Sequence, residues 1–195
     1  MTRFVQIVCL TVLSSIVVGY GCKKEPKSDN NDIPVMLIPK GFPAMTFPEG
    51  NEYTEARWAL GKRLFYERKL SRNNTINCAS CHQANNAFGD KVAFSFGDND
   101  AAGTSNAPTL TNIGYNPYFT RAGGVPTREM QILVPIQEHN EFNSNIVDIV
   151  AELGQDSSYA KQAKNAYNRA FDAFVLTRAI ANFERSLISG NAPFD

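Results

Sequence analysis

The sequence holds few of the residues that build most metal and redox sites. Among 195 residues there are two histidines, one tryptophan and four cysteines. A zinc site needs a second Cys or His pair beside the first, and the chain has no such second pair. A thioredoxin-like dithiol begins a helix that directly follows a strand, and the single Cys-x-x-Cys pair does not lie in that context. Both of these site types are therefore disfavoured.

The charges of the chain balance. It has 19 Lys and Arg residues against 19 Asp and Glu residues, so its formal net charge is zero. A nucleic-acid-binding domain usually carries a basic surface that neutralises phosphates. We therefore expect no nucleic-acid partner.

The motif Cys78-Ala79-Ser80-Cys81-His82 is the most informative feature of the sequence. Two thiols three positions apart, followed at once by an imidazole, match the attachment site of a c-type haem. Cys78 and Cys81 can add to the haem vinyl groups as thioethers, while the short turn between them delivers His82 to the iron as its proximal ligand. The sequence therefore predicts one covalently bound haem c.

The first 21 residues resemble an export signal of the bacterial lipoprotein type. Arg3 precedes an apolar run from Phe4 to Tyr20, which is too short and too weakly flanked to predict a membrane span. We expect Cys22 to be acylated as the first residue of the mature chain, although Gly19 stands where such signals prefer leucine. An ordinary secretory signal cleaved nearby, which would leave the protein unanchored, is the alternative.

From this leader we predict where the protein is located and which segments make up its chain. Residues 22–32 form a polar tether whose three lysines would lie solvated beside the membrane, and residues 33–195 form one haem domain. Cys9 leaves with the signal and Cys22 takes lipid, so no cysteine remains for a disulfide. We expect the haem domain on the periplasmic side of a bacterial cell envelope, anchored to the membrane through lipid.

The pattern of apolar residues predicts a mainly α fold. Apolar residues recur every four positions between residues 54 and 66, as on one face of a helix. Further helices are expected at 145–153, ended by Gly154, at 158–170, and at 172–189, ended by Gly190. The haem motif should open a short helix, and no two-residue alternation indicates a sheet. We therefore expect a cytochrome c-like haem domain.

Two segments should be irregular. Four prolines between residues 33 and 48 forbid a regular helix there, which predicts an extended segment. Residues 89–126 contain glycines and prolines that leave room only for short helical pieces. We expect this long irregular region to wrap the haem, because its aromatic residues can supply buried area. These aromatic residues are Phe94, Phe96, Tyr115, Tyr118 and Phe119, with Phe88 directly before them.

Several separated motifs together resemble one protein family. They are Leu60-Gly61-Lys62-Arg63-Leu64-Phe65-Tyr66, Leu70-Ser71, the haem motif, Asn106-Ala107-Pro108-Thr109-Leu110, Gln131, Pro135-Ile136, Glu141 and Ala192-Pro193-Phe194-Asp195. Their order and approximate spacing are similar to those of bacterial di-haem cytochrome c peroxidases and their MauG-like relatives. The resemblance runs from about Pro39 to the end and covers the family's N-terminal, peroxidatic haem domain. The family's second, electron-transferring haem domain would follow the residue at which this sequence ends.

The resemblance implies haem-dependent reduction of hydrogen peroxide with electrons from a small cytochrome or copper protein. Glu141 matches the family's acid/base glutamate, and a carboxyl group in a haem pocket can have its pKa raised by burial. Gln131 matches a pocket glutamine that can hydrogen-bond the distal oxygen. Asn106 matches a residue that helps to bind calcium between the two domains, and we expect no bound calcium in this chain because half of that site is absent.

The sequence departs from the family at two functional positions. The loop that carries a distal histidine in some relatives offers Asp98, a poor sixth ligand, so we expect an open haem that needs no reductive activation. We interpret His139, the one alternative histidine ligand, as an exposed polar residue. The family's tryptophan between the two haems is missing, and we expect Trp58 to pack the first helix. The stretch that matches this tryptophan segment is Phe119-Thr120-Arg121-Ala122-Gly123-Gly124.

Two main functional hypotheses follow. In the first, the chain is a fragment or partner-dependent half of a di-haem peroxidase, completed by a second haem domain or a partner chain. In the second, it is a membrane-tethered mono-haem electron carrier or sensor, whose iron would take a methionine or histidine as sixth ligand. Met130 is the methionine to consider, because Met36 and Met45 lie in the proline-rich segment. A peroxidase that has lost its activity also fits the short length and the missing tryptophan.

Overall fold

The computed structural model describes residues 36–192. These residues all belong to the part of the chain that follows a division between Ile33 and Pro34. The expected signal at 1–21, the tether at 22–32 and the acylation site Cys22 lie outside the described residues, so they stay predictions.

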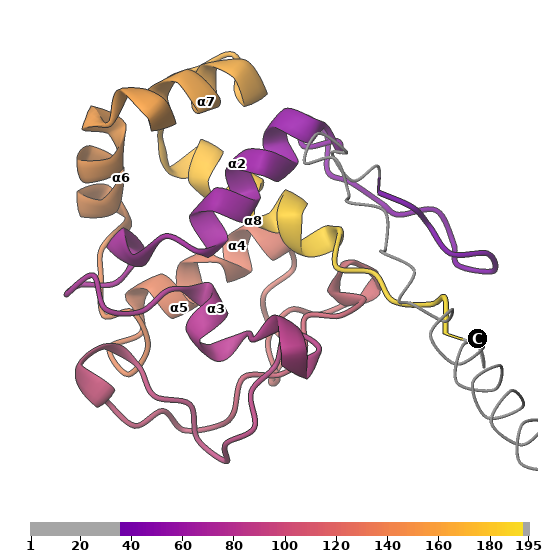
Figure 1. Cartoon of the computed structure of the whole chain (residues 1–195), viewed down its shortest axis with the longest axis horizontal. Helices are drawn as coiled ribbons and strands as arrows, with labels where there is room; N and C mark the ends of the chain where they lie inside the picture. The colour runs from indigo at the N-terminus through magenta and orange to yellow at the C-terminus, as the bar shows by residue number, and fades with distance from the viewer. Residues whose placement is uncertain (1–35, 193–195) are drawn as a thin grey trace, which may run out of the picture. The chain divides into compact units, whose positions relative to one another are not determined.

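Helices account for almost all the regular structure in this part of the chain (Figure 1). The α-helices are α2 (Glu55–Phe65), α3 (Cys78–Cys81), α4 (Arg128–Gln131), α5 (Leu133–Gln137), α6 (Ile146–Gln155), α7 (Ser157–Tyr167) and α8 (Ala173–Arg185). Short 3-10 helices are η2 (Arg68–Leu70), η3 (Ala84–Asn86), η4 (Asp98–Asp100) and η5 (Ile113–Tyr115). The β pairing within residues 36–192 is limited to two isolated bridges, Gln83 with Gly89 and Phe96 with Ala102. The predicted mainly α fold is confirmed.

Helices α2 and α8 cross at the centre of the described structure (Figure 1). Helix α2 buries one face there, whereas α8 is buried on nearly all sides. Thr54 begins α2, because its hydroxyl accepts a hydrogen bond from the Arg57 amide at 3.2 Å. Leu60 and Leu64, two of the residues that predicted this helix, are fully buried. The apolar residues that α8 buries are Val175, Leu176, Ala179, Ile180, Ala181 and Phe183. The contact between the two helices forms the centre of the hydrophobic core.

Gly61 allows α2 and α8 to approach closely. A Cβ atom at this position would lie 1.9 Å from the Ala179 carbonyl oxygen and 2.9 Å from the Phe183 Cβ. Both distances are far below van der Waals contact, and the nearest atom belongs to a packed helix backbone. The glycine is therefore required by the distance between the two helices.

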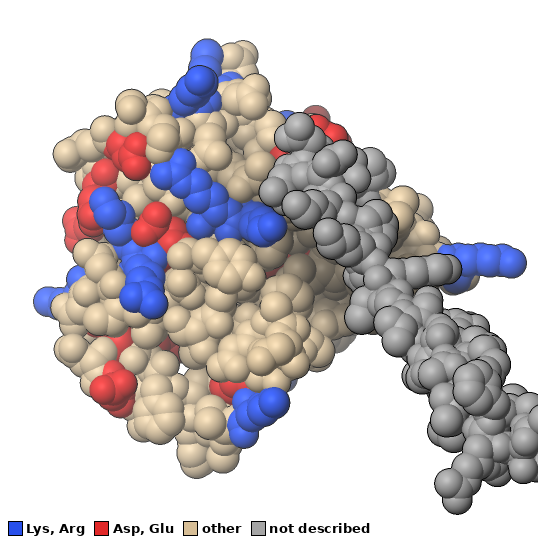
Figure 2. Space-filling view, in the orientation of Figure 1, with Lys and Arg blue, Asp and Glu red and all other residues tan. Residues whose placement is uncertain are grey.

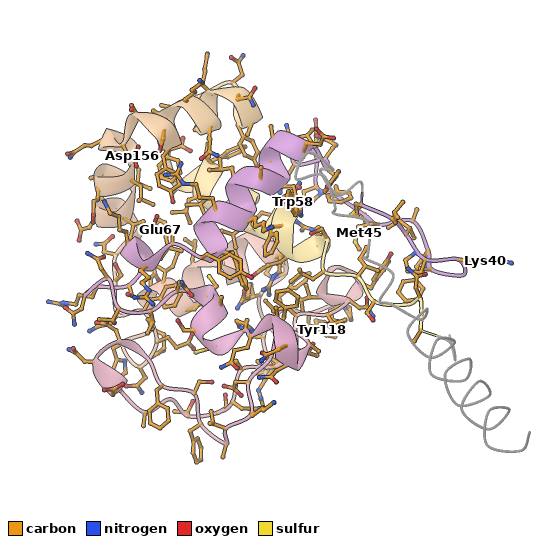
Figure 3. The ribbon with its side chains drawn as sticks, in the orientation of Figure 1. Lys40, Met45, Trp58, Glu67, Tyr118 and Asp156 are labelled. Carbon is orange, nitrogen blue, oxygen red and sulfur yellow. The ribbon has the colours of Figure 1, made fainter. Side chains whose placement is uncertain are left out.

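Trp58 extends the same contact, as the sequence predicts. Its ring centroid lies 6.0 Å from that of Phe183, and its Nε1 donates a hydrogen bond to Ser186 Oγ at 2.9 Å. Figure 3 shows Trp58 extending from α2 toward α8. The indole therefore packs the first helix against the last one.

Two helix ends in the C-terminal half differ from the prediction. The sequence predicts an end at Gly154, but α6 continues through this glycine to Gln155. Asp156 then begins α7 by accepting a hydrogen bond from the Ser158 amide at 2.8 Å. The predicted end of α7 at residue 170 is also wrong, because Asn168 adopts a left-handed φ of 55° and ends the helix at Tyr167.

Helix α8 also ends earlier than the predicted residue 189. The amides of Ser186 and Leu187 bond to carbonyl groups three residues back, at 3.0 and 3.1 Å, which tightens the last turn and closes the helix. Gly190 is therefore not the residue that ends α8. A Cβ atom at Gly190 would lie 2.6 Å from the Phe42 ring, so this glycine accommodates a close aromatic contact instead.

Left-handed asparagines shape many of the turns between helices. Asn74, Asn99, Asn112, Asn143 and Asn168 all have φ between 49° and 62°. Asparagine tolerates this region better than most residues because its short amide can hydrogen-bond the local backbone. The long region 89–126 is irregular, as predicted, and contains only the short helices η4 and η5.

The aromatic residues of this region are less buried than predicted. Phe94 and Tyr118 are 54% and 67% exposed, so the expectation that they supply buried area is wrong. Phe96 is 55% exposed, but it lines the cavity that holds the haem motif. Phe88 and Phe119 do pack against the core. The outer side chains of an irregular loop are poorly covered by the rest of the protein. The conformation of the region 89–126 is held by hydrogen bonds instead. They include Ser95 amide to Ser105 carbonyl at 3.0 Å and Gly103 amide to Ser95 carbonyl at 2.8 Å.

Basic and acidic side chains are intermixed on the face of the molecule that Figure 2 shows. None of the helices within residues 36–192 is long and apolar enough to cross a membrane.

We predict that Gly61→Ala destabilises the fold. The added methyl group has no space between α2 and α8, and such overpacking costs about 1–3 kcal/mol or more. Urea unfolding followed by circular dichroism measures the change.

Gly154→Ala is the matched control, because it places the same methyl group in helix α6. The nearest atom would lie 3.9 Å away, at the Phe171 carbonyl oxygen. This substitution should stabilise the protein slightly, since alanine favours a helix by about 0.5–1 kcal/mol over glycine. Equal effects of the two substitutions would contradict the steric explanation for Gly61.

Candidate functional site

A hydrogen-bonded turn leads from the first helix to the Cys-x-x-Cys-His motif. The Ser71 hydroxyl oxygen accepts hydrogen bonds from the amides of Thr75 and Ile76, each at 3.2 Å. The Asn77 side chain donates to the Tyr66 carbonyl at 2.9 Å, which ties the start of α3 to the end of α2. The polar, asparagine-rich segment 71–77 therefore acts as the predicted turn.

Helix α3 is a single turn that places the two thiols and the imidazole together. The Asn77 amide donates to Ser80 Oγ at 3.0 Å at its start, and the His82 amide donates to the Cys78 carbonyl at 2.9 Å at its end. The predicted short helix at the motif is thus present. It brings the side chains of Cys78, Cys81 and His82 to one cavity.

The ring of His82 is held in the orientation of a metal ligand. Its Nδ1 lies 2.9 Å from the Phe88 carbonyl oxygen, so Nδ1 carries the proton and Nε2 keeps its lone pair. Burial lowers the pKa of His82, which favours the neutral imidazole that binds a metal.

One cavity of about 260 Å³ collects the residues that the sequence singles out for chemistry. Its wall contains Cys78, Cys81, His82, Asn106, Gln131 and Glu141. Buried apolar residues such as Leu110, Ile132 and Ile180 form other parts of the wall. A wall of this composition suits a largely apolar cofactor with a few polar groups.

The residues present fit a covalently attached haem. Cys78 and Cys81 are free thiols that line the cavity together with His82. Burial raises the pKa of both thiols, and the Asp90 carboxylate adds to the effect at Cys81. Such thiols stay protonated in the chain without a cofactor. Within residues 36–192 no group of three or more His, Cys, Asp or Glu side chains could hold a metal ion.

Glu141 stands on a turn that fixes it at the cavity wall. Its amide donates to the Glu138 carbonyl at 3.0 Å, and the next amide, of Phe142, donates to the Pro135 carbonyl at 3.0 Å. The residue is exposed, yet its carboxyl lies in the concave wall, where loss of water and the Glu138 carboxylate raise its pKa. A carboxyl with a raised pKa exchanges protons at a pH closer to neutrality.

The loop around Gly97 packs directly on the backbone that carries Glu141. A Cβ atom at Gly97 would lie 2.1 Å from the Asn140 carbonyl oxygen. The Asp98 amide donates to the Glu141 carbonyl at 2.7 Å, and the Asp98 side chain accepts from the Thr75 hydroxyl at 2.6 Å. Asp98 is buried and does not belong to the cavity wall. It anchors the loop and does not offer itself as an iron ligand.

Gln131 presents an unused hydrogen-bond acceptor at the cavity. It ends α4, whose first turn is capped by the Thr127 hydroxyl through a 3.2 Å bond from the Met130 amide. The side-chain Oε1 of Gln131 is buried and has no hydrogen-bond partner among residues 36–192. An unpaired buried acceptor costs about 1–3 kcal/mol. A ligand that donates a hydrogen bond to this oxygen would remove that penalty.

Among the residues that the structure describes, the wall holds no second histidine and no methionine that could fill the sixth position of an iron bound by His82. The His139 side chain is 77% exposed and pairs with Glu138 at 2.8 Å, as expected of a polar surface residue. Met130, the candidate of the electron-carrier hypothesis, is 53% exposed and lies outside the wall.

Two buried ion pairs join α4 to α8, and the sequence analysis misses them. Arg128 pairs with Glu184, and Arg185 pairs with Glu129 through contacts of 2.7 and 3.0 Å. The four residues are between 3% and 7% exposed. Arg128 and Glu184 also line the cavity. The complementary doublets Arg128-Glu129 and Glu184-Arg185 are the sequence signal that indicates such a pairing.

Further hydrogen bonds complete the second of these pairs. The Asn51 side chain donates to Glu129 Oε1 at 2.8 Å and accepts from the Tyr167 hydroxyl at 2.9 Å. Burial acts to raise the pKa of Glu129, but the bonds and charge of Arg185 and the bond from Asn51 outweigh it and hold the pKa below its usual value. The carboxylate therefore stays ionised inside the protein.

Asn106 already has a cationic partner. Arg121 Nη2 donates to the Asn106 carbonyl at 2.9 Å and also contacts its side-chain Oδ1. Both residues line the cavity. The oxygen atoms of Asn106 that could bind a cation are thus engaged by a guanidinium group.

Comparisons with known proteins identify relatives over most of the described chain. A family model for the di-haem cytochrome c peroxidases matches residues 55–195. The methylamine utilization protein MauG of Methylorubrum extorquens is 31% identical over 150 residues, which are 76% of this chain and 42% of that protein. Cytochrome c peroxidase Ccp of Escherichia coli is 32% identical over 178 residues, which are 90% of this chain and 36% of that protein. The chain thus spans less than half the length of these curated relatives.

Solved structures with the same arrangement of helices are also known. A MauG-like protein associated with microbial copper homeostasis superposes with a TM-score of 0.73 at 30% identity, covering 78% of this chain and 46% of that one. The diheme peroxidase BthA from Burkholderia thailandensis superposes with a TM-score of 0.60 at 20% identity, covering 66% of this chain and 38% of that one. The second of these similarities shows a shared fold.

We predict that Arg128→Met destabilises the protein by about 3–5 kcal/mol, because it leaves the buried Glu184 carboxylate without a partner. The double substitution Arg128→Met with Glu184→Met should recover most of this loss, since it leaves no buried charge at the pair. Urea unfolding of both variants, followed by circular dichroism, tests the expectation. A double variant no more stable than the single one would show that the pair is not the cause.

Proposed function

Because the chain belongs to the di-haem cytochrome c peroxidase family, we propose that it forms a haem-bearing half of an enzyme that reduces hydrogen peroxide to water. The family implies c-type haem, and we assign one covalent haem c to Cys78, Cys81 and His82. Each peroxide molecule takes up two electrons and two protons and yields two water molecules. A small cytochrome or copper protein would donate the electrons.

One observation carries this proposal more than any other. A single cavity combines the haem attachment residues with a carboxyl group of raised pKa, at Glu141, and an unpaired amide oxygen, at Gln131. Cleavage of peroxide requires an open position at the iron, a proton carrier and a group that orients the substrate. The described wall offers the last two, and it contains no second histidine and no methionine that would fill the open position.

The chain's own residues have distinct tasks in this reaction. Bound haem would supply the iron at which the oxygen–oxygen bond breaks. Glu141 accepts a proton from one peroxide oxygen and returns it to the other, which leaves as water. Gln131 Oε1 accepts a hydrogen bond from a peroxide hydroxyl and thereby orients the substrate.

The source of the electrons is a further part of the proposal. The matched relatives extend well beyond the length of this chain. We propose that a second haem domain or a partner chain passes the electrons to this haem. We also propose that Cys22 carries lipid and that the haem domain faces the periplasm, because c-type haem attachment and a lipoprotein-type leader both belong outside the cytoplasm.

The positions of Met130 and His139 argue against the electron-carrier hypothesis. Such a carrier needs a methionine or histidine as sixth iron ligand. Both side chains are largely exposed and lie outside the cavity wall. A visible spectrum of the ferric protein with a filled sixth position would revive that hypothesis.

We predict that Glu141→Gln slows peroxide cleavage by about a hundredfold or more, because glutamine keeps the shape of the side chain but cannot carry the proton. Stopped-flow absorbance of the haem-loaded ferric protein, mixed with one equivalent of peroxide, measures the rate. An unchanged rate in this variant would remove Glu141 from the mechanism.

Glu138→Gln is the matched control and tests the pKa of Glu141. The Glu138 carboxylate helps to raise that pKa, so its removal lowers it. Cleavage needs ionised Glu141, and the rate therefore rises as the pH passes the pKa of that carboxyl. In the Glu138→Gln protein this rise should move to lower pH, with the same maximal rate. A pH profile identical to that of the parent protein would contradict the electrostatic coupling.

A further inference from the structure

The charges in the cavity wall leave one arginine without an acidic partner. The charged side chains there are Arg121, Arg128, Glu141 and Glu184. Arg128 and Glu184 neutralise each other. No acidic side chain pairs with Arg121 among residues 36–192, and its bonds go to two neutral oxygens of Asn106. A guanidinium group on neutral acceptors keeps its full charge available for an anion.

Arg121 belongs to a polar edge of the cavity. Two segments, 104–106 and 120–121, bring their polar residues to the same wall. Thr104, Ser105 and Arg121 are exposed, whereas Asn106 and Thr120 are half-buried, so this edge lies at the solvent side. Buried apolar residues such as Leu70, Ile136 and Phe142 line other parts of the wall. The cavity is thus apolar inside and polar, with one unpaired cation, at one edge.

A c-type haem has the complementary distribution of polarity. Its macrocycle is apolar, and two propionate carboxylates project from one edge. Carboxylates bind arginine through two parallel hydrogen bonds, which fixes their position as well as their charge. A position close to the Glu141 carboxylate would be unfavourable for them, because two like charges close together raise each other's energy. The wall therefore offers these carboxylates a favourable partner at Arg121.

We propose that Arg121 binds a propionate of the haem, with Asn106 holding the guanidinium in place. This inference rests on the proposed assignment of one haem c to the cavity. The bound cation would stabilise the more negatively charged, reduced form of the haem and so raise its reduction potential. Arg121 would also keep the pKa of the propionate low, so that the carboxylate remains ionised across neutral pH.

The test is a spectroelectrochemical titration of the haem-loaded full chain at several pH values. Arg121→Gln should lower the reduction potential and make it dependent on pH near neutrality, because the propionate loses its cationic partner and protonates more readily. Arg121→Lys keeps the charge but loses the paired hydrogen bonds, so its potential should lie between those of the parent and Arg121→Gln. It also provides a second readout should the glutamine variant fail to fold.

Arg72→Gln is the matched control. Arg72 is exposed and lines a separate surface depression, so its removal changes the net charge equally without touching the cavity. This variant should keep the potential of the parent, and an equal drop in both glutamine variants would overturn the proposal. A reduction potential equal to that of the parent in both Arg121 variants would also overturn the proposal.

Two further outcomes separate this inference from the proposed function. Slower peroxide cleavage in Arg121→Gln at an unchanged potential would overturn the inference, because it would show that Arg121 acts on peroxide. A parent protein that binds no haem at Cys78 and Cys81 would overturn the proposed function itself. A parent that binds haem but whose potential ignores Arg121 would overturn the inference alone.

Discussion

The close crossing of α2 and α8 is the constraint on which the other contacts depend. At Gly61 the helices approach until no side chain fits between them, so their separation is set by backbone contact. Helix α2 leads through one turn to the haem motif, and α8 contributes Ile180 and Glu184 to the cavity wall. The distance between the two helices therefore fixes two walls of the same cavity relative to each other.

The buried ion pairs extend this framework to helix α4. Arg128 and Glu129 bind α4 to α8, and the same helix α4 ends at Gln131. Buried pairs contribute little net stability but strongly penalise any arrangement that separates them. They therefore define how α4 lies on α8, which determines where the Gln131 amide meets the cavity. Rigid support of this kind is what the role proposed for Gln131, orienting a small substrate, requires.

The sequence predicts the parts of this protein that depend on neighbours along the chain. The helix at Leu60 and Leu64, the short helix of the haem motif and the irregular region after it all follow from local patterns. Gly154 and Gly190 mislead, because a glycine indicates a helix end only where the backbone turns left-handed. Gly154 lies inside a helix with space around it, and Gly190 permits a close contact with Phe42. The doublets Arg128-Glu129 and Glu184-Arg185 indicate that ion pairs can form, but only the packing of α4 on α8 decides which residues meet. No local pattern reveals the bond between Arg121 and Asn106. The outward position of Phe94 and Tyr118 likewise depends on what the folded loop can cover.

The left-handed turns have a consequence for how the chain reaches its folded state. Five of them use asparagine, a residue with a Cβ atom, where glycine would fit the geometry with less strain. Glycine samples far more backbone conformations when unfolded, and all of that freedom disappears on folding. Compared with glycine, each asparagine adds a small steric penalty to the folded turn. It also reduces the number of backbone conformations that the unfolded chain can adopt. In a domain with long irregular stretches, asparagine at these turns therefore limits the number of backbone conformations that the chain must search where it reverses direction.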